Sequence, residues 1–224
     1  MLTNYMSLKD HVYNYISDKI NDGSLKPDDK INEQQIADAL HISRTPIREA
    51  LIQLASDGFL ENTPRRGFRV QFLDLKKVQE LYEIIGILDG RAAYKAVDLI
   101  KEEDLKTMKF LANSMDIAIE QGMSTKYYEL QIQFHNTYLN LYDNNELILL
   151  LNKLKNTFLR KYYVFNDSNN EIQILKATNL EHHEIIRLFK EKKKEELECY
   201  IRDVHWNKDN ALFDALDPTD GNQF

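Results

Sequence analysis

Apolar residues recur at helical spacing through most of the chain. One example runs at i, i+3, i+4, i+7 and i+11 through Leu147, Leu150, Leu151, Leu154 and Phe158. This repeat places its members on one face of a helix. No proline interrupts residues 65–217, so this stretch lacks the strongest helix breaker. The pattern predicts an all-α antiparallel helical bundle.

The N-terminal part of the chain reads differently. Its apolar positions predict three helices and two short strands over about 7–20, 32–40, 43–57, 59–62 and 67–70. Asn32 and Ser43 have suitable side chains to cap the second and third helices. Pro46 lies in the first turn of the third helix, where a missing N–H is tolerated. The order helix, helix, turn, helix, hairpin predicts a winged helix-turn-helix.

The expected fold class is therefore mainly α, in two domains. We expect a winged helix-turn-helix domain over 1–72, a helical domain over 73–213, and a C-terminal tail over 214–224. Hydrophobic residues make up 43% of the chain, which is enough for a core. No window approaches the ~18 apolar residues of a membrane helix, and the start lacks the pattern of an export signal. The single cysteine, Cys199, agrees with a reducing cytoplasm.

The net charge of −7 hides a local excess of positive charge. Residues 41–70 hold five arginines against three acidic residues, a net of +2. Arg44 and Arg48 are four apart, so they share one face of the third helix near its N-terminus. An arginine fork can pair with guanine or clamp a phosphate. An isolated arginine pair is ordinarily a solvated surface, but its coincidence with this layout and a basic hairpin tip favours DNA binding.

These residues carry a family resemblance. Residues 32–70 read NEQQIADALHISRTPIREALIQLASDGFLENTPRRGFRV and closely resemble the winged-helix motif of the GntR family of bacterial transcription regulators, in which SRTPVREAL and an RRG wing recur. The resemblance implies DNA contacts by Ser43, Arg44, Thr45 and Arg48, and contacts near the DNA backbone by Gln34, Arg65, Arg66 and Gly67. His41 stands where the family usually has glycine, and histidine tolerates the left-handed backbone that this turn needs.

The helical part, over about 76–210, resembles the FadR-type effector domain called FCD. The likeness rests on three segments: LYEIIGILDGRAAYKAV, QIQFHNTYLNL, and EHHEIIRLF followed by Asp203-Val204-His205. Such domains bind a small-molecule effector, and many hold a metal ion. The resemblance therefore implies a regulator that responds to a ligand.

Three histidines lie on separate helical segments of this part: His135, His183 and His205. Three converging imidazoles suit Zn²⁺ or Ni²⁺. By resemblance these three are the metal ligands, with Gln131 as a weak fourth ligand where the family has aspartate. A helix break near 191–194 would let the last two histidines meet, and we expect His182 to point to the surface. The alternative is a polar cavity without an ion.

The effector is less well defined. Many FCD-type regulators have, at the position of Ile85, an arginine that pairs with an effector carboxylate. Either an organic acid is held here by the metal and another cation, such as Arg160, or the effector is not a simple organic acid.

The sequence thus predicts a cytoplasmic transcription regulator and no enzyme. It would bind a palindromic operator as a homodimer, as a repressor by the habit of the family, without membrane contact. One alternative is a helical metallohydrolase that uses His135, His183 and His205. Against it, we find no general base placed as in an HExxH helix and no nucleophile paired with a base. A purely architectural DNA protein would leave the helical domain without a role.

Overall fold

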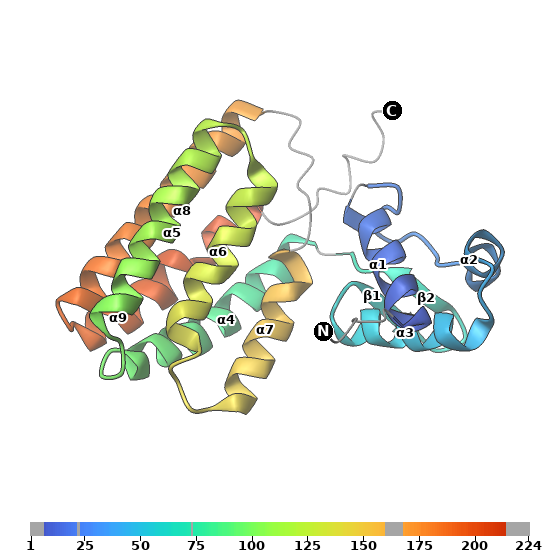
Figure 1. The fold of residues 1–224 in the computed structure, drawn as a ribbon, viewed down its shortest axis with the longest axis horizontal. Coiled ribbons are helices and arrows are strands. Elements are labelled where there is room, and N and C mark those ends of the chain that lie inside the picture. The colour runs from blue at the N-terminus through green and yellow to red at the C-terminus, as the bar shows by residue number, and fades with distance from the viewer. Residues whose placement is uncertain (1–6, 22, 73, 160–167, 214–224) are drawn as a thin grey trace, which may run out of the picture. The chain divides into compact units, whose positions relative to one another are not determined.

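The computed structural model describes residues 7–21, 23–72, 74–159 and 168–213 (Figure 1). The chain divides into two compact units: the first comprises residues 1–74 with 153–162 and 216–224, and the second comprises residues 75–152 and 163–215. The predicted tail, 214–224, lies outside the described residues. None of the described helices is long and apolar enough to cross a membrane.

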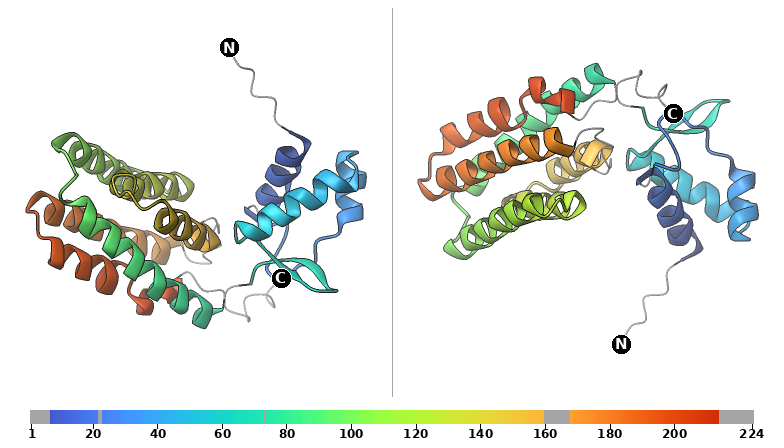
Figure 2. Two further views of the ribbon diagram at one scale, coloured as in Figure 1. Left: turned by 90° about the horizontal axis from the view of Figure 1, so that it is seen from below. Right: turned by 90° about the horizontal axis from the view of Figure 1, so that it is seen from above.

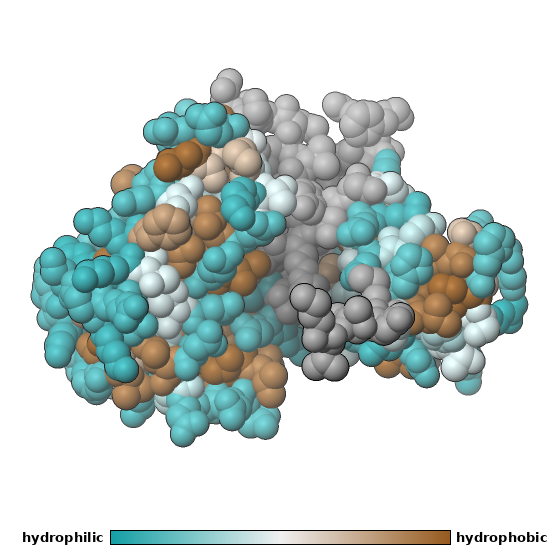
Figure 3. Space-filling model, viewed as in Figure 1, coloured by the Kyte–Doolittle hydropathy of each residue, from teal (hydrophilic) through white to brown (hydrophobic). Residues whose placement is uncertain are grey.

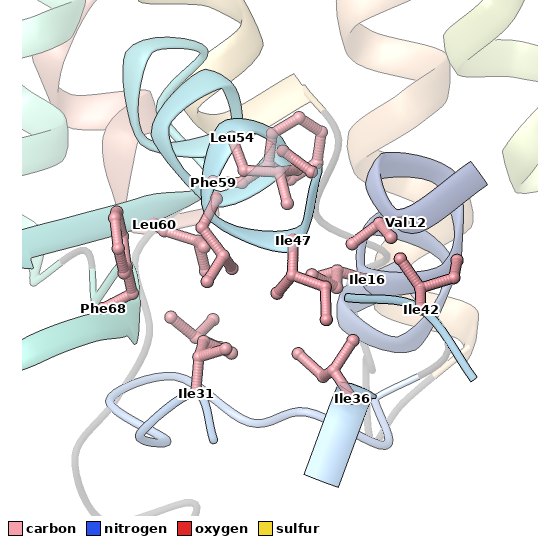
Figure 4. Packing of buried hydrophobic residues seen from close by; sticks show 13 residues of the cluster. Val12, Ile16, Ile31, Ile36, Ile42, Ile47, Leu54, Phe59, Leu60 and Phe68 are labelled. Carbon is pink, nitrogen blue, oxygen red and sulfur yellow. The ribbon is translucent and has the colours of Figure 1, made fainter. Parts of the chain in front are cut away.

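The first unit has the predicted order of elements. Its helices and strands are α1 (Leu8–Asn21), α2 (Glu33–Leu40), α3 (Arg44–Ser56), β1 (Leu60–Thr63) and β2 (Gly67–Val70). Val12 and Ile16 of α1 pack with Ile36 of α2 and Ile47 of α3 in one buried cluster (Figure 4). Burial of these aliphatic side chains, at about 1.5–3 kcal/mol each, fixes how α3 lies on the unit.

The strands form the predicted hairpin, with antiparallel pairing from Leu60 opposite Val70 to Thr63 opposite Gly67. Gly67 has a φ of +80°, a conformation that glycine adopts without strain. A bridge between Lys30 and Arg69 adds a short third segment to this sheet. The winged helix-turn-helix prediction is confirmed.

The helix caps are confirmed in part. Asn32 caps α2, because its Oδ1 accepts hydrogen bonds from the backbone N–H groups of Gln34 and Gln35 at 3.0 and 3.2 Å. Ser43 holds the N-cap position of α3 in an extended conformation, but its side chain makes no capping hydrogen bond. His41 has the expected left-handed backbone, with a φ of 55°.

Most of the described residues from Leu75 onward are helical, as the apolar spacing predicts. The elements are α4 (Leu75–Ala96), α5 (Glu102–Glu120), α6 (Ser124–Leu139), α7 (Asn145–Leu159), α8 (Ser168–Lys190), α9 (Lys194–Tyr200), a π-helical turn η1 (Ile201–His205) and a 3₁₀ turn η2 (Lys208–Phe213). Helix α5 packs against α6 and α8, and α4 packs against α9 and η1 (Figure 2). The predicted break falls between α8 and α9, where Lys192 has a φ of 55°.

Two glycines let α4 approach α9 and η1 closely. A Cβ atom at Gly90 would lie 2.8 Å from the backbone oxygen of Glu198, and one at Gly86 would lie 3.0 Å from that of Arg202. The contact at Gly90 is shorter than real Cβ atoms show, and the contact at Gly86 is tighter than most of them. This close approach brings Asp89 of α4 within hydrogen-bond distance of Trp206, the residue after η1.

Candidate functional site

The residues that the sequence assigns to DNA binding lie at the surface of the first unit. All eight are exposed: Gln34, Ser43, Arg44, Thr45, Arg48, Arg65, Arg66 and Gly67. They come from the start of α2, the start of α3 and the tip of the hairpin. Major-groove readers of this type present the N-terminal residues of their recognition helix to base edges. The placement is therefore the one that DNA binding needs.

Residues of α2 hold both arginines of α3. The amide oxygen of Gln34 accepts a hydrogen bond from Nη2 of Arg44, while its Nε2 donates to Asp38 at 2.7 Å. Nε of Arg48 lies 3.3 Å from Oε2 of Glu33, and the Arg48 side chain is 69% exposed. These contacts restrict the arginine side chains and leave them open to a partner.

In the second unit, three histidines form a buried cluster. They are His135 on α6, His182 on α8 and His205 at the end of η1, and each is at most 6% exposed. One nitrogen from each lies within 4.8 Å of the other two. Nε2 of His135 is 3.2 Å from Nε2 of His205.

This cluster corrects the predicted set, because His182 takes the place assigned to His183. His182 is fully buried and not at the surface. The His183 side chain is 36% exposed, and its Nε2 lies 3.1 Å from Oδ2 of Asp116 on α5. The signal was present in the sequence: Leu175, His182 and Phe189 are seven apart and share the buried face of α8. Matching the HEII segment to the family motif assigned His183 to the cluster, one residue after the histidine that lies there.

The second nitrogen of each histidine has a partner outside the cluster. Nδ1 of His205 lies 2.7 Å from Oε2 of Glu181. Nδ1 of His182 lies 3.1 Å from Oδ1 of Asn179. Metal-binding histidines are commonly held by such contacts from the other ring nitrogen.

Nδ1 of His135 meets a buried polar group that the sequence did not single out. It lies 2.7 Å from the Tyr138 hydroxyl and 3.2 Å from Oδ2 of Asp89. Asp89 is fully buried, and it accepts hydrogen bonds from Tyr138 at 2.6 Å and from Nε1 of Trp206 at 2.9 Å. Burial first, and the Asp89 charge second, raise the pKa of Tyr138 well above its usual value. The Tyr138 hydroxyl therefore keeps its proton and donates a hydrogen bond to Asp89.

The π-helical turn explains how His205 and Trp206 both face the interior. Side chains of adjacent residues in an α-helix point about 100° apart, and the wider π-helical turn of η1 changes this angle locally. Both residues are buried, at 6% and 5% exposure. Turns of this kind are frequent at functional sites.

The cluster fits a late first-row metal ion. Two nitrogen ligands ~2.1 Å from a tetrahedral ion lie ~3.4 Å apart, close to the 3.2 Å between the His135 and His205 nitrogens. Within the described residues, the cluster includes no carboxylate. Gln131 is buried on α6, one turn before His135. A neutral, nitrogen-rich set of this kind favours Zn²⁺ or Ni²⁺ over Mg²⁺ or Mn²⁺.

Two predictions concerned the effector. Ile85 is fully buried on α4, so this position offers an apolar side chain and no cation. Arg160 lies outside the described residues.

Comparison with protein families gives two matches. The family described as "Bacterial regulatory proteins, gntR family" matches residues 8–70. The family described as "FCD domain" matches residues 80–204.

Individual proteins agree with these matches. The chain is 32% identical over 200 residues to the uncharacterized HTH-type transcriptional regulator YdhC of Bacillus subtilis, covering 88% of this chain and 87% of that protein. It is 25% identical over 181 residues to the Nta operon transcriptional regulator of Aminobacter aminovorans, covering 79% and 80%. Among solved structures, McbR/YncC of E. coli has the same fold, with a TM-score of 0.71 at 22% identity over 92% of this chain and 97% of that one. The names of the Bacillus and Aminobacter proteins describe transcriptional regulators and give no support to the metallohydrolase alternative.

Proposed function

Because the chain belongs to the GntR family of bacterial transcription regulators and carries an FCD domain, we propose that it represses transcription as a homodimer on a palindromic operator. A small molecule bound in the helical domain would control operator affinity. The proposal divides the chain functionally at 72/73. Residues 1–72 would bind DNA, and residues 73–213 would bind the effector and the second subunit.

The observation that carries the proposal is the exposed pair Arg44 and Arg48 at the start of α3. Arginine can pair with O6 and N7 of guanine in the major groove or hold a phosphate with two hydrogen bonds. Ser43 and Thr45 would add hydroxyl contacts beside them. The hairpin tip, with Arg65 and Arg66, would contact the DNA backbone or the minor groove.

A dimer follows from the size of the recognition element. One recognition helix reads only half of an operator, and two half-sites in a palindrome lie ~34 Å apart. The helical unit exposes apolar side chains among polar ones (Figure 3). Phe110, Ile117 and Leu180 each expose 60% or more of their surface. Burying such side chains between two subunits would stabilise a dimer.

The cluster of His135, His182 and His205 would hold a divalent ion, with Zn²⁺ or Ni²⁺ preferred. The bound ion would supply a positive charge and open coordination positions for an anionic group of the effector, such as a carboxylate. The three histidines would fix the position of this charge, because each ring is held from its outer nitrogen. Effector binding would change operator affinity about 5–150-fold, the usual range of allosteric coupling.

Selection of bound duplexes from a random DNA library tests the regulator proposal. We expect enrichment of one palindrome with half-sites a helical turn apart, and a complex of two chains per duplex by multi-angle light scattering. The mass of the free protein should be twice the 26.4 kDa of one chain. Enrichment of a single half-site by one chain, or no enrichment, would contradict the proposal.

A further inference from the structure

The outer contacts of the three clustered histidines determine where each ring carries its proton. A neutral imidazole donates from one nitrogen and accepts at the other, so a partner that can only accept fixes the tautomer. Glu181 is the simplest case. Its carboxylate lies 2.7 Å from Nδ1 of His205 and has no proton to donate, so Nδ1 of His205 carries the hydrogen.

Asn179 fixes the tautomer of His182 through the orientation of its own side-chain amide. The Nδ2 group of Asn179 donates to the backbone oxygen of Ala112 at 3.0 Å and to Oδ1 of Asp116 at 2.6 Å. Both of its N–H groups are therefore used on α5, and a flipped amide would place its oxygen against two acceptors. The side-chain oxygen of Asn179 must face His182, at 3.1 Å. Nδ1 of His182 carries the hydrogen.

Asp89 and Tyr138 together fix the tautomer of His135. The indole N–H of Trp206 can only donate, and the Tyr138 hydroxyl uses its single proton on Asp89. The Tyr138 oxygen is thus left as an acceptor for Nδ1 of His135 at 2.7 Å, with Oδ2 of Asp89 at 3.2 Å as a second acceptor. Nδ1 of His135 carries the hydrogen as well.

We infer that Asp89, Asn179 and Glu181 are positioning residues that hold all three histidines as the Nδ1–H tautomer before any ion binds. The site then presents three Nε2 lone pairs to a common point, and two of them face each other at 3.2 Å. A metal ion at this point, or a proton between the two facing nitrogens, relieves the repulsion between the lone pairs. The inference rests on the proposed metal-binding role of the cluster and adds the residues that prepare it.

The same contacts bear on the charge of the site. Gln131 stands where the resemblance implies an aspartate ligand, so the ligand set itself is neutral. Asp89 and Glu181 place two carboxylates directly behind His135 and His205. A carboxylate behind a ligating histidine raises the basicity of the ring. When an ion is bound, Asp89 and Glu181 would therefore supply, from behind the ligands, the negative charge that Gln131 lacks.

Nitrogen NMR of the metal-free, full-length protein labelled with ¹⁵N-histidine tests the tautomers directly. At pH 8, we expect His135, His182 and His205 to give protonated-type Nδ1 and unprotonated-type Nε2 signals, assigned with single His→Gln variants. An Nε2–H tautomer at any of the three would overturn the inference. This readout needs no metal. A chain with the expected tautomers that binds no zinc would therefore refute the proposed metal site and leave the tautomer inference standing.

Variants at Glu181 test the positioning role, with Glu184 as a matched control on the same helix. Glu181→Leu removes the acceptor, so we expect the His205 signals to shift toward the other tautomer and zinc affinity to fall about 10–100-fold. Glu181→Gln keeps an acceptor oxygen and should keep the tautomer, with a smaller loss of affinity. Glu184 contacts Arg187 and no clustered histidine, so Glu184→Leu should change neither. Equal effects of the Glu181→Leu and Glu184→Leu substitutions would overturn the role of Glu181.

Discussion

Nε2 of His135 lies 3.2 Å from Nε2 of His205, although the two residues are 70 positions apart in the chain. The contact depends on the packing of α4 against η1, because Asp89 of α4 bonds both to Trp206 beside His205 and to the Tyr138 that holds His135. The three-histidine site is thus a product of helix packing as much as of its ligands.

Gly90→Ala tests this dependence on packing. The added Cβ would meet the backbone oxygen of Glu198 at 2.8 Å, so α4 and α9 must separate. Overpacking costs about 1–3 kcal/mol, against a gain of ~1 kcal/mol in helix propensity, so we expect a net loss of up to about 2 kcal/mol in the free energy of unfolding. Thermal denaturation measures it, with Lys95→Ala on the exposed face of α4 as the control. A variant as stable as the wild type would show that the close approach is not needed.

Gln131→Asp tests the charge of the ligand set. A carboxylate one turn before His135 would add a charged oxygen donor, so we expect zinc affinity to rise about tenfold or more. Mn²⁺ should gain more than Zn²⁺, since hard ions prefer oxygen ligands. Gln131→Asn is the uncharged control, and competition with a coloured chelator gives the affinities. Equal affinity in both variants would place residue 131 outside the coordination sphere.

Arg48→Ala tests the recognition helix. A good base or phosphate contact contributes about 1–3 kcal/mol, and a dimer makes it twice, so operator affinity should fall by about 2–6 kcal/mol. Fluorescence anisotropy at fixed salt measures the affinity, because salt alone changes it strongly. Lys9→Ala on α1 removes the same charge elsewhere in the unit and should have a much smaller effect. Equal losses from both substitutions would contradict base or phosphate contact by Arg48.

Tyr200 gives the helical unit an alkaline limit. Partial burial, with the charges of Glu181 and Glu184, raises the pKa of Tyr200 to about 12 from 10.0. The folded state therefore holds this proton more tightly than the unfolded state, and its stabilising effect is lost as pH rises from about 10 to 12. Denaturant unfolding over this range should show a steeper loss of stability for the wild type than for Tyr200→Phe. Parallel curves would contradict the shifted pKa.

Much of the fold could be predicted because local signals decide it. The caps, Pro46 and the β-prone runs place the winged helix within a residue or two, and the order of elements then fixes which residues are exposed on α3. The break after α8 was likewise readable from the need to bring two segments together. The elements of the winged helix depend on neighbours in sequence, whereas the break followed from the spacing of two histidines.

The histidine cluster depends on packing and was predicted only in part. His135 and His205 were identified, but the choice between the adjacent His182 and His183 turns on a rotation of about 100° around α8, which a short motif does not specify. The buried seven-residue spacing from Leu175 to Phe189 would have specified it. Asp89 lies in a segment that carries the family resemblance but was given no role, and Asn179 belongs to no quoted segment, since the roles of both come from partners on other helices.

Zinc titration of the chelator-stripped protein and two single variants tests the metal centre most directly. We predict one ion per chain for the wild type and for His183→Ala, with a higher melting temperature in each when zinc is present, because an ion that binds only the folded state stabilises it. His182→Ala should lose both the high-affinity ion and the zinc-dependent rise. Retention of both by the His182→Ala protein, or their loss in His183→Ala alone, would contradict the assignment of His135, His182 and His205 as the metal site.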